Sequence, residues 1–132
     1  MSSASFCLDS DVLIWHLRKG HREDVSQYLK ELAAQGDLVT TAISIAEIEQ
    51  GARPGELDET RALLRSLPII AIDRDVAERA GEIARELRAL GVTLNLADAL
   101  IAAACLVHRL ALVTLNVRHF EKVVGLELNV VP

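Results

Sequence analysis

The sequence predicts an α/β fold in which a parallel sheet is covered by helices on both faces. The first observation is that short apolar runs of strand type alternate along the chain with segments whose apolar residues recur at helical spacing. The second is that no repeat, low-complexity segment or linker interrupts this alternation. The 132 residues also match the usual size of one domain, so we expect a single domain over residues 1–132.

The first elements are a strand and two helices. Residues 5–8 form a short apolar run of strand type, and a short helix is expected at residues 11–19, stopped by Gly20. A second helix is expected at residues 23–34, closed by Gly36. Its apolar residues recur at helical spacing: Val25, Leu29, Leu32 and Ala33.

The middle of the chain continues the alternation. Residues 38–41 are few and β-branched, which predicts a strand, and residues 44–50 read as a helix ended by Gly51. Residues 56–66 have the pattern of an amphipathic helix. The apolar run LPIIAI that follows fits either a buried strand or an extended connection, and the pattern does not separate the two.

The last third contains the longest helical patterns. Residues 75–90 carry apolar residues at helical spacing, and residues 96–108 are apolar on nearly every side, which predicts a central, buried helix. A clear strand at residues 110–114, a helical turn at residues 117–123 and a final strand at residues 126–131 complete the chain.

Composition and charge exclude several classes of protein. A net charge of -5 argues against a protein that coats nucleic acid through a broad basic face, although it leaves room for a small acidic site. The four aromatic residues are scattered, which argues against a base-stacking platform. No apolar stretch approaches the roughly 20 residues needed to cross a bilayer. Cys7 and Cys105 lie in apolar runs, so we expect buried thiols in a cytoplasmic protein.

Polar side chains follow two of the predicted strands. Asp9 and Asp11 come directly after the first strand, and Thr114 and Asn116 lie at the end of the strand at residues 110–114. Open α/β sheets carry their working residues at the carboxyl ends of the strands. These four residues are therefore the first candidates for a functional site.

Acids near the starts of three predicted helices have an ordinary explanation. A helix N-terminus favours a capping side chain and an acid in its first turn. Each acid fits such a role in the sequence: Asp9 or Ser10 as a cap, Ser44 with Glu47 as a capping box, and Asn95 as a cap followed by Asp98. Taken singly, each acid is explained by capping.

Asp98 is the acid that capping explains least well. It begins the helix expected to be buried on every side, where a carboxylate is costly without a cation, a proton or several donors. Glu47 supports the same argument, because its neighbours in sequence are apolar. A divalent ion such as Mg²⁺ would remove this cost, since hard cations prefer carboxylate oxygens. From the pattern alone, a metal site and three capped helices explain these acids about equally well.

Four segments in order resemble one known family. The stretches LDSDVLI, SIAEIEQGA, LNLADALIAA and LVTLNVRHFEKVVGLEL resemble those of PIN-domain proteins, most closely the VapC toxins of bacterial and archaeal toxin–antitoxin pairs. The resemblance covers residues 8 to about 130. It implies a three-layer fold with a central, mostly parallel sheet of four to five strands flanked by helices.

The resemblance also implies an activity and a site. Members of this family are Mg²⁺- or Mn²⁺-dependent endoribonucleases that cut structured RNA such as tRNA or rRNA. Carried over by position, the family's metal-binding acids fall on Asp9, Glu47 and Asp98. Asn116 stands where many members have a fourth acid, and it is expected to orient water or phosphate. The remaining candidates would support these ligands or contact RNA: Asp11, Thr114, Arg118 and His119.

Partners and surrounding charges follow from the same resemblance. It implies a homodimer and a VapB-type antitoxin that covers the active-site groove, and the lack of a long apolar stretch predicts no membrane partner. An acidic site repels RNA until a metal is bound, so nearby cations are expected to help. The candidates in the sequence are Arg18, Lys19, Arg53, Arg118 and Lys122.

Three other functions are compatible with parts of the pattern. The D-S-D stretch also resembles the nucleophile motif of haloacid-dehalogenase-like phosphatases with Asp9 as nucleophile, although Leu13 departs from that motif and Lys30 is the sole candidate for its lysine before Asp98. A response-regulator receiver would use Asp73 as phosphoacceptor, and it leaves Glu47 and Asp98 unexplained. A PIN fold without catalysis, binding RNA or antitoxin, is the third alternative.

Overall fold

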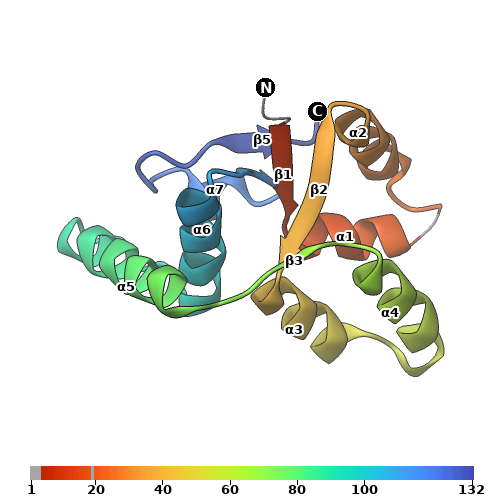
Figure 1. Cartoon of the computed structure of the whole chain (residues 1–132), viewed down its shortest axis with the longest axis horizontal. Helices are drawn as coiled ribbons and strands as arrows, with labels where there is room; N and C mark the ends of the chain where they lie inside the picture. Colours follow the sequence, from red (N-terminus) through yellow and green to blue (C-terminus); the bar gives the residue numbers. More distant parts are fainter. Residues whose placement is uncertain (1–3, 19) are drawn as a thin grey trace.

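The structure is a computed structural model that describes residues 4–18 and 20–132, and its elements alternate between strands and helices (Figure 1). The strands are β1 (Ala4–Leu8), β2 (Gly36–Thr41), β3 (Ile69–Ile70), β4 (Ala111–Thr114) and β5 (Leu128–Val130). The helices of the first half are α1 (Ser10–Leu17), α2 (Glu23–Ala33), α3 (Ala42–Gly51), the 3₁₀ turn η1 (Pro54–Glu56) and α4 (Leu57–Arg65). Those of the second half are α5 (Arg74–Ala89), α6 (Leu96–His108) and α7 (Val117–Phe120).

The five strands form one parallel sheet in the order β3-β2-β1-β4-β5. β1 is central, with Phe6 opposite Leu38 of β2 on one side and opposite Ala111 of β4 on the other. The chain builds outward from β1 to β3, then returns through α5 and α6 to the other side of β1. The expected α/β fold with a mostly parallel sheet of four to five strands is confirmed.

Two apolar cores cover the two faces of the sheet. Phe6 and Leu8 of β1 pack in one core with residues of α1, α2 and α4, whereas Cys7 packs in the other core with α5 and α6. Successive residues of a strand point to opposite faces, so an entirely apolar strand needs helices on both sides. Figure 1 shows the resulting layers, with α5 and α6 on one side of the sheet and α1 to α4 on the other.

The observed boundaries correct three details of the sequence interpretation. Gly36 is the first residue of β2 and does not close α2. α3 begins at Ala42, and its N-cap is Thr41, whose Oγ1 accepts a hydrogen bond of 3.1 Å from the backbone N–H of Ser44. The expected capping box of Ser44 with Glu47 is therefore wrong, because Ser44 is itself the third residue of the helix. The run LPIIAI contributes only the two-residue edge strand β3.

Both cysteines are buried and free, as expected. None of the helices in the described ranges, 4–18 and 20–132, is long and apolar enough to cross a membrane.

Candidate active site

The carboxyl ends of β1 and β4 lie side by side at the point where the chain reverses its direction across the sheet. Such a switch point is where open α/β sheets place their binding sites. The backbone N–H of Asp9 donates to the carbonyl of Val113 at 3.0 Å, and Thr40 Oγ1 donates to the carbonyl of Leu8 at 2.8 Å. These bonds fix the turn that carries the first two acids.

Asp9 is the most deeply buried of the candidate acids, with 4% of its surface exposed. It caps α1, since its Oδ1 accepts a hydrogen bond of 2.8 Å from the backbone N–H of Ser10. Its Oδ2 accepts a second bond of 2.8 Å from Thr114 Oγ1. A buried carboxylate with two neutral donors and no cation retains a large desolvation cost. The burial argued from the sequence for Asp98 therefore applies most strongly to Asp9.

Asp11 lies beside Asp9 and shares the hydroxyl of Thr114. Its Oδ2 accepts a hydrogen bond from the backbone N–H of Leu115 at 3.1 Å and lies 3.4 Å from Thr114 Oγ1. Its Oδ1 is buried and has no hydrogen-bond partner in the described part of the chain. A buried carboxylate oxygen without a donor is rare in folded proteins and marks a position for an absent proton, water or cation.

Ser10 and Thr114 connect the acids to the sheet and to one another. Ser10 Oγ donates to Glu47 Oε1 at 3.2 Å, so the residue between the two N-terminal acids holds the acid that α3 supplies. Thr114 is fully buried, and its Oγ1 also accepts the backbone N–H of Asn116 at 3.0 Å. The sequence interpretation treats Ser10 only as a possible cap. Its position between Asp9 and Asp11 in the sequence is the feature that could have indicated this second role.

Asp98 faces the same region from the first turn of α6. Asn95 caps that helix as expected, because its Oδ1 accepts the backbone N–H of Asp98 at 2.8 Å. The Asp98 side chain is 13% exposed, and its Oδ2 lies 3.0 Å from His119 Nδ1. The structure thus places Asp98, a candidate metal ligand, within hydrogen-bond distance of His119, a candidate substrate contact.

Electrostatics show that the four acids share one environment. Burial, followed by the charge of Asp11, raises the pKa of Asp9 from 3.8 to about 7, and the charge of Asp98 adds to the rise. Burial is also the main cause that raises the pKa of Asp11 and of Glu47. The charge of Asp98 raises the pKa of both as well. Mutual repulsion of this kind is typical of carboxylates held together for a cation or a proton.

Comparisons with known proteins agree with this arrangement. Residues 6–126 match the family model of the PIN domain. The chain belongs to the PIN-domain family. It is 38% identical over 113 residues to a protein of Mycobacterium tuberculosis named Ribonuclease VapC10. The aligned region covers 86% of this chain and 84% of that protein.

Two solved structures share the fold. A toxin–antitoxin complex from Klebsiella pneumoniae contains a chain 33% identical to this one, with a TM-score of 0.74 and coverage of 94% and 95% of the two chains. A crystal structure of VapBC from Salmonella typhimurium bound to DNA gives a TM-score of 0.85 at 22% identity, with coverage of 98% and 99%. The expected resemblance to PIN-domain proteins of the VapC group is confirmed.

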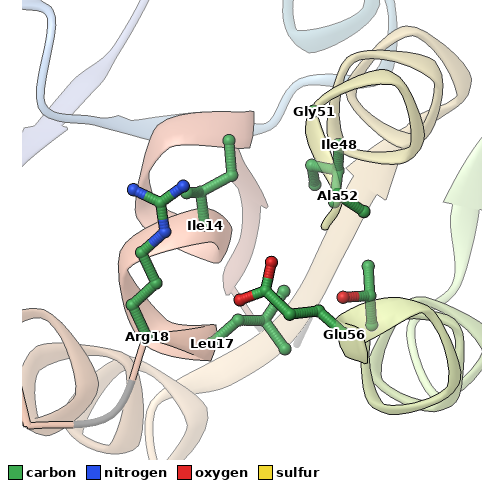
Figure 2. A pocket seen from close by; sticks show the side chains of 8 residues that line it. Ile14, Leu17, Arg18, Ile48, Gly51, Ala52 and Glu56 are labelled. Carbon is green, nitrogen blue, oxygen red and sulfur yellow. The ribbon is translucent and has the colours of Figure 1, made fainter. Parts of the chain in front are cut away.

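The other residues that the sequence suggests for the site lie in several parts of this PIN domain. Asn116 is exposed at the N-cap of α7, and Arg118 lines a cavity together with Asp98 and His119. Arg18 lines a separate pocket together with Glu56, and Figure 2 shows the Arg18 side chain running along α1 toward Ile14 and that of Glu56 extending toward Leu17. Arg53 is exposed beside η1, and Lys122 lines a groove with Leu90. Lys19 lies outside the described residues.

The donor set of this PIN domain fits a hard divalent cation. Among residues 4–18 and 20–132, no three Asp, Glu, His or Cys side chains converge into a ready-made metal cage. Mg²⁺ does not require one, because it usually keeps several waters and binds through one or two carboxylates. A cation at this position would bind the partnerless Oδ1 of Asp11 and would stabilise the charged form of Asp9, whose pKa is raised by burial. The residues that could hold a cation are Asp9, Asp11, Glu47 and Asp98.

The same contacts argue against the phosphatase alternative. Asp9 is almost fully buried, so a phosphate ester, which is much larger than a metal ion, has little access to its carboxylate. Asp73, the phosphoacceptor of the receiver alternative, caps α5 by accepting the backbone N–H of Val76 at 3.0 Å. Capping explains that residue without a phosphorylation site.

Proposed function

We propose that this protein is a Mg²⁺- or Mn²⁺-dependent endoribonuclease that acts as the toxin of a type II toxin–antitoxin pair. Its substrate is structured cellular RNA such as tRNA or rRNA, and its metal ligands are Asp9, Glu47 and Asp98. The observation that carries the proposal is the group of mutually repelling acids at the switch point of a PIN fold, with Asp9 buried and its pKa raised to about 7. The relative named Ribonuclease VapC10 supports the reaction class.

The protein's own residues would hold the acids in place for hydrolysis. Thr114 donates to Asp9 and lies next to Asp11, and Ser10 donates to Glu47. His119 anchors Asp98, and these bonds restrict the carboxylates that would face the phosphate. A bound divalent ion would supply charge neutralisation at the phosphate and a water of lowered pKa. Asn116 is exposed beside Thr114 and would orient a water or a phosphate oxygen.

The proposed partners are a second copy of the chain and a VapB-type antitoxin. The 33% identical chain from Klebsiella pneumoniae was solved as a toxin–antitoxin complex, which supports an antitoxin for this protein. Exposed apolar side chains such as Leu90 and Val124, 77% and 84% exposed, supply surface that a partner could cover. We further propose that residues 1–132 are one PIN domain acting in the cytoplasm.

Cleavage of RNA by purified protein tests the proposed function. Total RNA is incubated with wild-type protein in Mg²⁺, in Mn²⁺ and in chelator, and cut sites are mapped by sequencing the new ends. The proposal expects discrete cut sites with either metal, none in chelator, and none for Asp98→Asn in any condition. Asp73→Asn, a change of the same chemistry at the N-cap of α5, is the matched control and should cut like wild type. Cleavage by Asp98→Asn at the wild-type rate would refute the proposal.

A further inference from the structure

A cavity of about 260 Å³ adjoins the acids. Its walls come from the segment before α6 and from α7, and they include Asp98 of the acid group. The residues that line it are Val92, Thr93, Leu94, Asn95, Asp98, Arg118 and His119. Because Asp98 borders both the cavity and the acids, a molecule in this cavity would lie next to the proposed site of hydrolysis.

The cavity combines the positive charge of Arg118 with apolar walls. Arg118 is exposed and forms no ion pair with any residue in the described ranges 4–18 and 20–132, which leaves its guanidinium available to a ligand. Val92 and Leu94 are half-buried and supply apolar surface, and Thr93 is exposed and supplies a hydroxyl. A planar guanidinium beside apolar walls suits a group that is anionic at one end and flat and apolar at the other.

His119 adds a ring whose position is fixed. Its Nδ1 lies 3.0 Å from Asp98 Oδ2, while its side chain remains 53% exposed. Unpaired RNA bases are commonly held by stacking on His or Arg side chains. A nucleotide has both of the properties that this cavity selects, namely a phosphate and a flat base.

We propose that this cavity binds one unpaired nucleotide adjacent to the phosphate that is cut, with Arg118 contacting a phosphate oxygen and the base lying between His119 and the apolar wall. This inference rests on the proposed ribonuclease function. The volume, just below the roughly 300 to 1,000 Å³ usual for ligand pockets, is comparable to that of one small planar ligand. Bases inside an A-form duplex are inaccessible to such a cavity, so the protein should select single-stranded loops or bulges.

Binding of short fluorescent RNAs tests the proposal separately from cleavage. Fluorescence anisotropy is measured with Ca²⁺ as the divalent ion, using a hairpin with an unpaired loop and a fully paired duplex of equal length, and a gel checks that the RNA stays intact. Wild type should bind the hairpin more tightly than the duplex. Arg118→Ala should weaken hairpin binding at least about tenfold, or about 1.4 kcal/mol, because it removes a charged hydrogen-bond donor to phosphate. It should also lower the slope of log affinity against log salt by about 0.7.

Two matched controls keep the result specific to the cavity. Arg85→Ala removes an exposed arginine of α5 and should leave binding unchanged. Thr93→Glu and Thr93→Gln have nearly the same shape, and only the Glu variant, whose charge repels phosphate, should weaken binding strongly. Equal affinity for hairpin and duplex, or equal effects of Arg118→Ala and Arg85→Ala, would overturn the proposal. If wild type binds as expected but cuts no RNA with Mg²⁺, the ribonuclease proposal fails and the nucleotide site stands.

Discussion

Replacing Asp9 with Asn should stabilise the metal-free protein, and the gain should depend on pH. Asp9 binds its proton more tightly in the folded state, where its pKa is about 7, than in the unfolded chain, where it is 3.8. Stability from a group with a raised acid pKa is present at low pH and is lost as pH rises from the unfolded value through the folded value. The wild-type protein should therefore lose stability between about pH 4 and pH 7.

The size of the effect follows from the same two values. A pKa difference of one corresponds to about 1.4 kcal/mol, so the rise from 3.8 to about 7 corresponds to about 4 kcal/mol of destabilisation at pH 8. Asn keeps an oxygen for the N–H of Ser10 or the hydroxyl of Thr114 and carries no charge to desolvate. Asp9→Asn should thus gain stability on the order of 4 kcal/mol at pH 8, a rise in Tm on the order of 10 °C, and markedly less at pH 5.

Urea unfolding in chelator at pH 5 and pH 8 measures this difference. Asp73→Asn is the control, because Asp73 also caps a helix but is exposed, and Asn caps as well as Asp does. The control should change stability little at either pH. The explanation from burial and repulsion is refuted if Asp9→Asn is no more stable than wild type at pH 8, or if its gain is the same at both pH values.

Other variants test the remaining contacts of the acid group. Glu47→Gln should reduce metal-dependent RNA cleavage at least about tenfold, measured with a labelled RNA. In chelator at neutral pH it should raise the unfolding midpoint slightly, because burial and the charges of Asp98 and Asp11 disfavour the charged form of Glu47; full activity would exclude Glu47 from the site. Thr114→Val removes the buried hydroxyl that donates to Asp9 and accepts from Asn116, and it should cost about 1 to 3 kcal/mol in urea unfolding. A cost near zero would show that this hydroxyl does not support the acids.

The order of strands and helices could be predicted from the sequence because each strand of this sheet is a short apolar run and each helix has its own apolar period. β1 and β4 are buried on both faces, so burial and pattern agree there. The pattern cannot decide β3, because this strand forms only two bridges at the sheet edge, at Ile69 and Ile70. The pattern predicts the start of α3 two residues late, because Thr41 both ends β2 and caps α3.

The candidate acids could be predicted as a set, but not their individual environments. Strand ends and family resemblance singled out Asp9, Glu47 and Asp98 without any tertiary contact. The depth of Asp9 depends on the packing of β1 against β4, and the contact of Asp98 with His119 joins residues 21 positions apart. The bond from Ser10 to Glu47 spans 37 positions, so no local pattern could distinguish it from a cap.

Binding of Mn²⁺ tests most directly the claim that these acids form a metal site. Free Mn²⁺ is measured by electron paramagnetic resonance during titration of wild type, Asp98→Asn and the control Asp73→Asn, with Mg²⁺ as competitor. If these acids hold the metal, Mn²⁺ should bind saturably to wild type and to Asp73→Asn and be displaced by Mg²⁺, and it should bind Asp98→Asn at least about tenfold more weakly, or by about 1.4 kcal/mol. Absence of saturable binding to wild type, or equal binding to Asp98→Asn, would contradict it.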